Sequence, residues 1–237
     1  MKNYFSIIGG MGTEATESYI HVLNQRTPSK KDQDYLNYIL VNHATIPDRT
    51  DYILDHTKPN PLPDLIEDIK QQSQIKPAPK FFALPCNTAH YFYKQLQEAT
   101  KIPILNMPKE AVKAISKFYP HAKRIGLIAT RGTIHDHIYD DEIKHAGYKL
   151  IHPSQKIEDE TMELIYDDIK TKDTVDAHLY HHILSEMIDL KKCDVVILGC
   201  TELSLAQERA SNHHFNIIDA QSVLVDCSIR MAIKNRN

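Results

Sequence analysis

The chain has 237 residues, of which 42% are hydrophobic and 25% are charged, and its formal net charge is −3 at pH 7. This composition is typical of a soluble globular protein and excludes a largely disordered chain. The lysines and arginines are scattered, so we expect neither a nucleic-acid-binding nor a membrane-binding surface.

The first eight residues, MKNYFSII, lead directly into Gly9 and Gly10 and lack the features of a secretory signal peptide. No apolar stretch approaches the length of a membrane span. We therefore expect a cytoplasmic protein whose four cysteines stay reduced.

Short apolar runs alternate with longer amphipathic segments along the chain. The predicted strands are Tyr4–Ile8, Tyr38–Val41, Phe81–Leu84, Ile102–Leu105, Ile125–Ala129, Tyr148–Ile151, Val195–Leu198 and Ile217–Ile218. The predicted helices are Thr16–Arg26, Leu62–Gln74, Ala89–Thr100, Lys109–Phe118, His135–Ala146, Glu158–Lys170, Val175–Asp189 and Ala220–Ile233. This alternation indicates βαβ units and a parallel sheet, whose ligands bind beyond the carboxyl ends of the strands.

Two pairs of segments resemble each other in the same order. IIGGMGT (7–13) resembles LIATRGT (127–133), and FFALPCNT (81–88) resembles VVILGCTE (195–202). Chance similarity between buried strands is one explanation. We interpret the pairs instead as an internal repeat, which predicts two similar α/β halves that face each other.

The expected boundaries of the two halves follow from this repeat. The first half is predicted to hold residues 1–104 and 209–237, with the C-terminal segment returning to it. The second half is predicted to hold residues 105–208. Cys86 then belongs to the first half and Cys200 to the second.

Cys86 and Cys200 each end a predicted buried strand and precede small polar residues. A helix N-terminus after each cysteine would lower the thiol pKa from its usual value of about 8.5 and would bind a carboxylate. Asn87, Thr88 and Thr201 would then supply donors beside each sulfur. The alternative is that these are two unrelated buried cysteines.

Two thiols that face each other across a cleft could form a redox pair, a metal site or a proton-transfer pair. The sequence has no C-x-x-C motif and no supporting Cys/His spacing, which argues against the first two. In a proton-transfer pair, one thiolate removes a proton from a carbon atom and the opposite thiol delivers one to the other face. Such a reaction inverts a stereocentre.

The motifs that carry this chemistry resemble the cofactor-independent aspartate/glutamate racemase superfamily, and the aspartate racemases most closely. They are GGMGTEAT (9–16), IPDRTDYIL (46–54), LPCNTAH (84–90), LIATRGT (127–133), IYDDIK (165–170) and LGCTEL (198–203). The resemblance covers nearly the whole chain. It implies two doubly wound parallel-sheet halves related by pseudo-twofold symmetry, an active site in the cleft between them, and a homodimer.

The resemblance also implies racemisation of an acidic amino acid, most simply L- and D-aspartate, without pyridoxal phosphate or any other cofactor. Cys86 and Cys200 would be the two acid/base thiols. The residues expected to bind the dicarboxylic substrate are Met11, Arg49, Asn87, Thr88, Thr130, Lys170 and Thr201. We expect Arg49 and Lys170 to contact its carboxylates, while Met11 and Thr130 line the cleft.

Other interpretations of these residues exist. Arg49 could form a surface ion pair with Asp48 or Asp51, and Lys170 could simply complement a helix dipole. Arg131 stands where aspartate racemases often have Thr, so it either points into the cleft or outward with no effect. Leu84 replaces an expected Met, a change we regard as neutral.

Two other functions remain open. One is a glutamate or broad-specificity amino-acid racemase, although the start IIGGMGT and Glu202 after Thr201 differ from the usual glutamate racemase pattern. The other is a non-catalytic amino-acid-binding protein. We expect no metal site, and we interpret HDHIYDDE (135–142) as an exposed, charged helix start. His90 could tune Cys86, although packing or capping is favoured.

Overall fold

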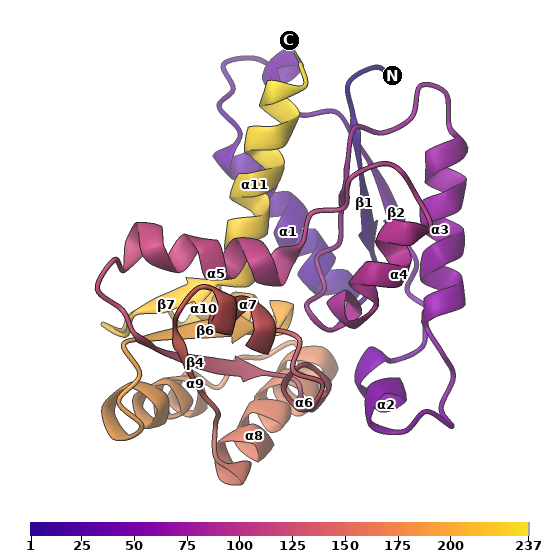
Figure 1. Ribbon diagram of the computed structural model, residues 1–237. Coiled ribbons are helices and arrows are strands. Elements are labelled where there is room, and N and C mark those ends of the chain that lie inside the picture. The colour runs from indigo at the N-terminus through magenta and orange to yellow at the C-terminus, as the bar shows by residue number, and fades with distance from the viewer. Residues whose placement is uncertain (237) are drawn as a thin grey trace. The chain divides into compact units, whose positions relative to one another are not determined.

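A computed structural model describes residues 1–236. The chain divides into two compact units, one formed by residues 1–107 with the segment from 221 onward, the other by residues 108–220. Each unit contains one parallel sheet with helices around it, which confirms the predicted α/β class (Figure 1). None of the helices in the described part of the chain is long and apolar enough to cross a membrane.

The sheet of the first unit has the strand order β2–β1–β3. Its strands are β1 (Phe5–Gly9), β2 (Tyr38–Asn42) and β3 (Phe82–Ala83). The helices of this unit are α1 (Thr13–Arg26), η1 (Asp32–Asp34), α2 (Arg49–Leu54), α3 (Leu62–Gln74), η2 (Thr88–Phe92) and α4 (Tyr93–Glu98), and most of α11 (Ala220–Lys234) also belongs to it.

All five residues of β1 are buried, because helices cover both faces of the strand. On one face, the Ser6 hydroxyl donates to the Gln72 side chain of α3 at 3.2 Å. On the other face, Gly9 lies against Thr16 of α1, so closely that a Cβ at Gly9 would lie 2.4 Å from the Thr16 methyl group. This two-sided burial explains why the strand reads as a continuous apolar run rather than an alternating one.

The sheet of the second unit has the strand order β5–β4–β6–β7. Its strands are β4 (Arg124–Ala129), β5 (Lys149–Ile151), β6 (Val195–Gly199) and β7 (Ile217–Asp219). Its helices are α5 (Met107–Phe118), α6 (Arg131–His135), α7 (Asp140–His145), α8 (Gln155–Met162), the π-helical η3 (Glu163–Lys170), α9 (Ala177–Ser185), the π-helical η4 (Glu186–Leu190) and α10 (Thr201–Arg209).

The two sheets match strand for strand. β1 and β4 are the inner strands, β2 and β5 flank them on one side, and β3 and β6 flank them on the other. Even β7, which pairs with β6, has a counterpart in the single bridge between Phe82 and Ile104. The segments that resemble each other in sequence therefore lie on equivalent strands: 7–13 and 127–133 leave β1 and β4, while 81–88 and 195–202 contain β3 and β6.

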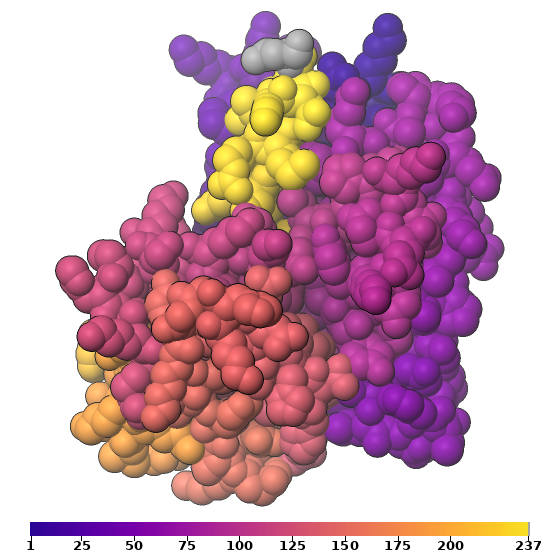
Figure 2. Space-filling view, viewed as in Figure 1, coloured from indigo at the N-terminus to yellow at the C-terminus, as the bar shows by residue number. Residues whose placement is uncertain are grey.

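Three expectations about the fold were wrong. Residues 209–220, expected in the first half, belong to the second unit because β7 pairs with β6. The predicted strand at 102–105 is reduced to the Ile104 bridge. The predicted helix at 135–146 is broken into α6 and α7 around His137, whose φ of 55° is left-handed. The α6–α7 segment lies on the face of the second unit seen in Figure 2.

Candidate active site

Cys86 and Cys200 follow corresponding strands of the two sheets. Cys86 comes shortly after β3 ends at Ala83, and Cys200 comes directly after β6 ends at Gly199. Both residues are buried, with 5% of each exposed, and both thiols are free. They stand at the carboxyl ends of parallel strands, which is where α/β sheets bind ligands.

The loop that carries Cys86 is held by His90. The Nδ1 atom of His90 lies 2.9 Å from the Cys86 carbonyl oxygen, and Nε2 accepts a hydrogen bond of 3.1 Å from the Met107 amide. Nε2 also lies 3.3 Å from the Leu105 carbonyl oxygen, and the shorter contact with the Met107 amide favours the tautomer in which Nδ1 carries the proton. Burial lowers the pKa of His90, which favours this neutral form. His90 thus fixes the backbone at Cys86, in line with the capping role that the sequence favoured.

Arg49 opens α2 and is buried. Its Nη1 atom donates to the carbonyl oxygens of Ile46 and Pro47 at 3.4 and 3.1 Å, and Nη2 donates to that of Met11 at 3.1 Å. These carbonyls fix the plane of the guanidinium and, being neutral, do not cancel its charge. The structure therefore joins Arg49 to Met11, two residues expected near the substrate.

Met11 and Cys86 belong to one cluster of buried side chains, and Asn87 and Thr88 are buried beside them. Asn87 directly precedes η2, which begins at Thr88 rather than at the cysteine. The helix after Cys86 is thus a short 3-10 turn, which begins later than the sequence indicated.

The Gly-rich loop after β1 needs glycine at position 10. Gly10 has a φ of +89°, and a Cβ there would lie 2.5 Å from the carbonyl carbon of His43. Its amide donates to the Thr16 hydroxyl at 3.0 Å, and that hydroxyl donates to the Gly12 carbonyl oxygen at 2.8 Å. The Thr16 hydroxyl therefore stabilises the loop by hydrogen bonds to the residues before and after Met11. The motif GGMGTEAT did not predict this role.

In the second unit, a buried carboxylate connects Cys200 to Lys170. The Cys200 thiol donates a hydrogen bond of 2.9 Å to Glu202 Oε2, and the Thr201 hydroxyl donates to the same oxygen at 3.2 Å. The other carboxylate oxygen, Oε1, lies 3.8 Å from Lys170 Nζ. Glu202 is only 4% exposed, so these contacts are shielded from water.

This environment overturns one expectation about Cys200. Burial raises the pKa of the Cys200 thiol well above its ordinary value, and the negative charge of Glu202 raises it further, while Lys170 opposes the shift. The thiol does precede the N-terminus of α10, as predicted, but burial and the carboxylate two residues away raise its pKa instead of lowering it. At neutral pH Cys200 therefore holds its proton.

Lys170 is the last residue of η3, and its Nζ lies 4.1 Å from the centre of the Tyr166 ring. Its side chain is 26% exposed. Contacts with both an aromatic face and a carboxylate hold the ammonium beside Cys200. The helix-dipole interpretation of Lys170 therefore describes only part of its environment.

Thr130 follows Ala129, which pairs with Gly199, so Thr130 and Cys200 leave neighbouring strands at the same level. Its hydroxyl oxygen caps α6 by accepting a hydrogen bond of 3.4 Å from the Thr133 amide. The next residue, Arg131, forms an ion pair with the half-exposed Asp159 of α8. This pairing favours the interpretation in which Arg131 points outward.

The structure gathers the predicted site residues into one set in each unit. The first set contains Met11, Arg49, Cys86, Asn87 and Thr88, and the second contains Thr130, Lys170, Cys200 and Thr201. Sequence reasoning missed Glu202, which it treated only as a departure from the glutamate racemase pattern. A carboxylate two residues after a strand-end cysteine was the signal that could have identified it.

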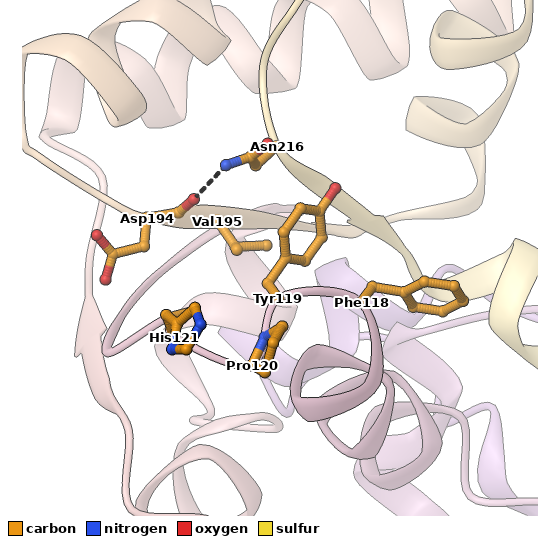
Figure 3. A pocket seen from close by; sticks show the side chains of 8 residues that line it. Phe118, Tyr119, Pro120, His121, Asp194, Val195 and Asn216 are labelled. Carbon is orange, nitrogen blue, oxygen red and sulfur yellow. Dashed lines mark hydrogen bonds between the residues drawn. The ribbon is translucent and has the colours of Figure 1, made fainter.

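A pocket of about 400 Å³ lies at the opposite end of the second sheet (Figure 3). Across it, the Asn216 side chain donates to the Asp194 carbonyl oxygen at 3.1 Å. Val195 lines this pocket at the start of β6, whereas Cys200 follows the end of the strand, about 16 Å away at 3.3 Å per residue. The pocket therefore contains none of the predicted site residues.

The family model described as Asp/Glu/Hydantoin racemase matches residues 8–227, which include both cysteines and every predicted site residue. The chain belongs to this racemase family. Membership of this family supports an isomerase that acts on amino acids.

Individual racemases resemble the chain over its whole length. The broad specificity amino-acid racemase RacX of Bacillus subtilis (strain 168) is 27% identical over 233 residues, 94% of this chain and 95% of RacX. The structure of Picrophilus torridus aspartate racemase has 26% identity and a TM-score of 0.81, covering 98% of this chain and 97% of that one. Glutamate racemase from Francisella tularensis, in complex with D-glutamate, shares the fold at 17% identity, with a TM-score of 0.70 over 100% of this chain and 83% of its own.

Proposed function

We propose that this racemase inverts the α-carbon of an acidic amino acid, aspartate in the first place, with Cys86 and Cys200 as the paired acid and base. One observation carries the proposal. The two buried, free thiols follow the same strand of two sheets with the same strand order, and polar residues follow each of them. The match to Picrophilus torridus aspartate racemase supports the choice of substrate.

In the proposed reaction, the thiolate of one cysteine takes the Cα proton. The electron pair left on carbon delocalises into the α-carboxylate, and the thiol of the other cysteine delivers a proton to the opposite face. Cationic groups and hydrogen-bond donors aimed at the carboxylate stabilise this charge more in the transition state than in the ground state. Arg49 is suited to this role, since its guanidinium is buried and held in one plane.

Lys170 would bind the second carboxylate of the substrate. The Lys170 ammonium would keep part of its interaction with Glu202 Oε1, now 3.8 Å away, so the Glu202 carboxylate and the substrate carboxylate would share it. A substrate with a neutral side chain would offer no second carboxylate, and Lys170 would interact with Glu202 as before. Lys170 therefore provides a physical reason for a preference for dicarboxylic amino acids.

Glu202 sets the protonation state of the pair. Cys200 is protonated and hydrogen-bonded to Glu202, so it begins the reaction as the acid that donates a proton to the substrate carbon. In the opposite direction Cys200 must act as a thiolate, and Lys170 would then balance the adjacent negative charges. Glu202 is thus a positioning residue that acts through Cys200.

A broad-specificity amino-acid racemase is the second candidate. It is favoured by the similarity to RacX, whose 27% identity extends over 94% of this chain. The same two thiols would serve any amino acid, because they act on the Cα proton and not on the side chain.

The experiment that tests the proposal is proton NMR of L-aspartate with the reduced protein in D₂O, with L-glutamate and L-alanine in parallel. We expect the Cα proton signal of aspartate to disappear as D-aspartate accumulates, faster than for the other two. Comparable rates for all three would support the broad-specificity candidate. Amino-acid binding without exchange at Cα would favour a non-catalytic binding protein and contradict the proposal.

A further inference from the structure

Two histidines and an aspartate meet beside β5, the edge strand of the second sheet. His137 lies in the turn between α6 and α7, Asp140 is the first residue of α7, and His152 follows β5. Asp140 Oδ2 lies 3.0 Å from His137 Nδ1 and 3.7 Å from His152 Nε2. All three atoms lie within 4.8 Å of one another.

These distances suit a small divalent cation. An ion with four ligands in a tetrahedron at about 2.0–2.1 Å keeps neighbouring ligand atoms about 3.4 Å apart. The separations of Asp140 Oδ2 from the two imidazole nitrogens, 3.0 and 3.7 Å, lie on either side of this value. The two imidazole rings are nearly perpendicular, at 82°, so their nitrogen atoms converge on Asp140 without the rings stacking.

The rest of the fold holds Asp140 in place. Its side chain is 22% exposed, and the Oδ1 atom is buried without a hydrogen-bond partner among the described residues. The two histidines meet the other oxygen, Oδ2, and a cation bound there would neutralise the charge of this partly buried carboxylate. The Asp140 amide donates to the His137 carbonyl oxygen at 3.0 Å, which fixes the spacing between these two ligands.

His152 is brought in by the sheet. The Tyr148 amide donates to the Ile143 carbonyl oxygen at 3.1 Å and so ties the end of α7 to the start of β5. β5 then runs parallel to β4 and delivers His152 at its carboxyl end. The side chains of His137 and His152 are 66% and 44% exposed, so an ion can reach the cluster from solvent.

In a second group of histidines in the same unit, the ring nitrogens already form hydrogen bonds with other protein groups. His181 Nε2 lies 2.9 Å from the Ala210 carbonyl oxygen. His213 Nε2 lies 2.7 Å from the Gln207 side-chain oxygen, and its Nδ1 accepts from the Phe215 amide at 3.2 Å. Protein groups occupy these nitrogen atoms, so this group has no comparable set of converging ligand atoms.

We propose that His137, Asp140 and His152 form a binding site for a divalent transition-metal ion of the Zn²⁺ type. Imidazole and carboxylate ligands suit such an ion, and water completes its coordination. The bound ion joins the turn before α7 to the end of β5. His152 and Cys200 follow the carboxyl ends of β5 and β6 in the same parallel sheet, with β4 between them, and the cluster contains none of the predicted site residues. We assign the ion a structural role.

The test uses Co²⁺, whose visible spectrum reports its ligands. We expect the reduced protein to bind one Co²⁺ with d–d bands and no sulfur-to-cobalt charge-transfer band. His152→Ala should weaken binding by at least about tenfold. His145→Ala is the matched control, because His145 is an exposed residue at the end of α7 outside the cluster, and it should bind as the unchanged protein does.

A second measurement does not depend on the variants folding. Zn²⁺ added to the unchanged, ¹⁵N-labelled protein should shift the ring nitrogen signals of His137 and His152, and leave those of His145 in place. The proposal would be overturned by a cobalt spectrum with thiolate bands only, or by unshifted ring nitrogen signals of both His137 and His152. It would also be overturned if folded His152→Ala bound Co²⁺ as tightly as the unchanged protein.

Discussion

The Cys200 thiol donates a hydrogen bond of 2.9 Å to the Glu202 carboxylate, and both residues are about 95% buried. In surroundings of low dielectric, a thiolate at this position would face a negative charge at close range. Lys170 offsets only part of that repulsion. The contact therefore keeps a proton on Cys200, and predictions about the second unit follow from it.

Glu202→Gln keeps the size of the side chain and removes its charge. We expect the pKa of Cys200 to fall, because the negative charge beside the thiol is lost. Racemisation should slow by about 10²-fold, since the acid is no longer held in its protonated form. Thiolate absorbance in the ultraviolet, followed against pH, measures the first effect. The pH–rate profile measures the second, and its basic limb should move to lower pH.

Glu208→Gln is the matched control for this change. Glu208 lies in the same helix, α10, on its exposed side. Its thiolate titration and rate profile should overlay those of the unchanged protein. If Glu202→Gln also overlays them, Glu202 does not control the proton on Cys200.

The second prediction concerns the two thiols themselves. Cys86→Ser and Cys200→Ser should each slow racemisation by about 10²–10⁴-fold, because a hydroxyl is a far weaker acid than a thiol. In D₂O, each variant should still exchange the Cα proton of one enantiomer slowly, through the cysteine that remains. The two variants should favour opposite enantiomers, and chiral chromatography combined with NMR measures this preference.

Cys193→Ala is the control for the thiol variants. Cys193 is buried before β6, and burial raises the pKa of its thiol to about 11. It has no part in the proposed reaction, so its replacement should leave the rate within about twofold of normal once the variant is shown to be folded. Full activity in either Cys86→Ser or Cys200→Ser would exclude a two-thiol mechanism.

The sequence predicted the strands well, because buried parallel strands read as apolar runs bounded by glycine or proline. Both cysteines were found at strand ends for the same reason. The C-terminal boundary was wrong because β7 is short and its pairing with β6 is a long-range contact that no local pattern encodes. The homodimer and the cytoplasmic location stay predictions.

Electrostatics was the less predictable part of the site. A helix N-terminus after Cys200 could be predicted from the sequence, yet burial and the charge of Glu202 raise the thiol pKa. The cluster of His137, Asp140 and His152 could not be assembled from the sequence for a related reason. His137 and Asp140 are close in sequence, but His152 reaches them only through the register of β5.

The third prediction tests Lys170 as a substrate contact. In Lys170→Ala we expect the KM for aspartate to rise by about tenfold or more, because a charge-assisted hydrogen bond is lost. The KM for alanine should change less, since alanine has no second carboxylate. Lys172→Ala is the control, because Lys172 is exposed and pairs with Asp168 at 2.9 Å. An equal rise in KM for aspartate and alanine would mean that Lys170 acts on Cys200 and does not bind the side-chain carboxylate of the substrate.

The last prediction concerns stability and depends on His90. Burial lowers its pKa below the ordinary value of 6.5, so the unfolded chain takes up this proton more readily than the folded one. The corresponding stabilisation is fully present above pH 6.5 and is lost as the pH falls toward the folded-state pKa. In that range one proton corresponds to a slope of about 1.4 kcal/mol per pH unit in the free energy of unfolding.

His90→Gln removes the titrating group, so the fall in unfolding free energy below pH 6.5 should become shallower by up to this slope. Urea unfolding at a series of pH values measures the difference. His21→Gln, at an exposed position of α1 in the same unit, is the control and should keep the slope of the unchanged protein. Identical slopes in all three proteins would mean that His90 is not held neutral by the fold. The contacts with Cys86 and Met107 would then have to be accounted for by a protonated ring.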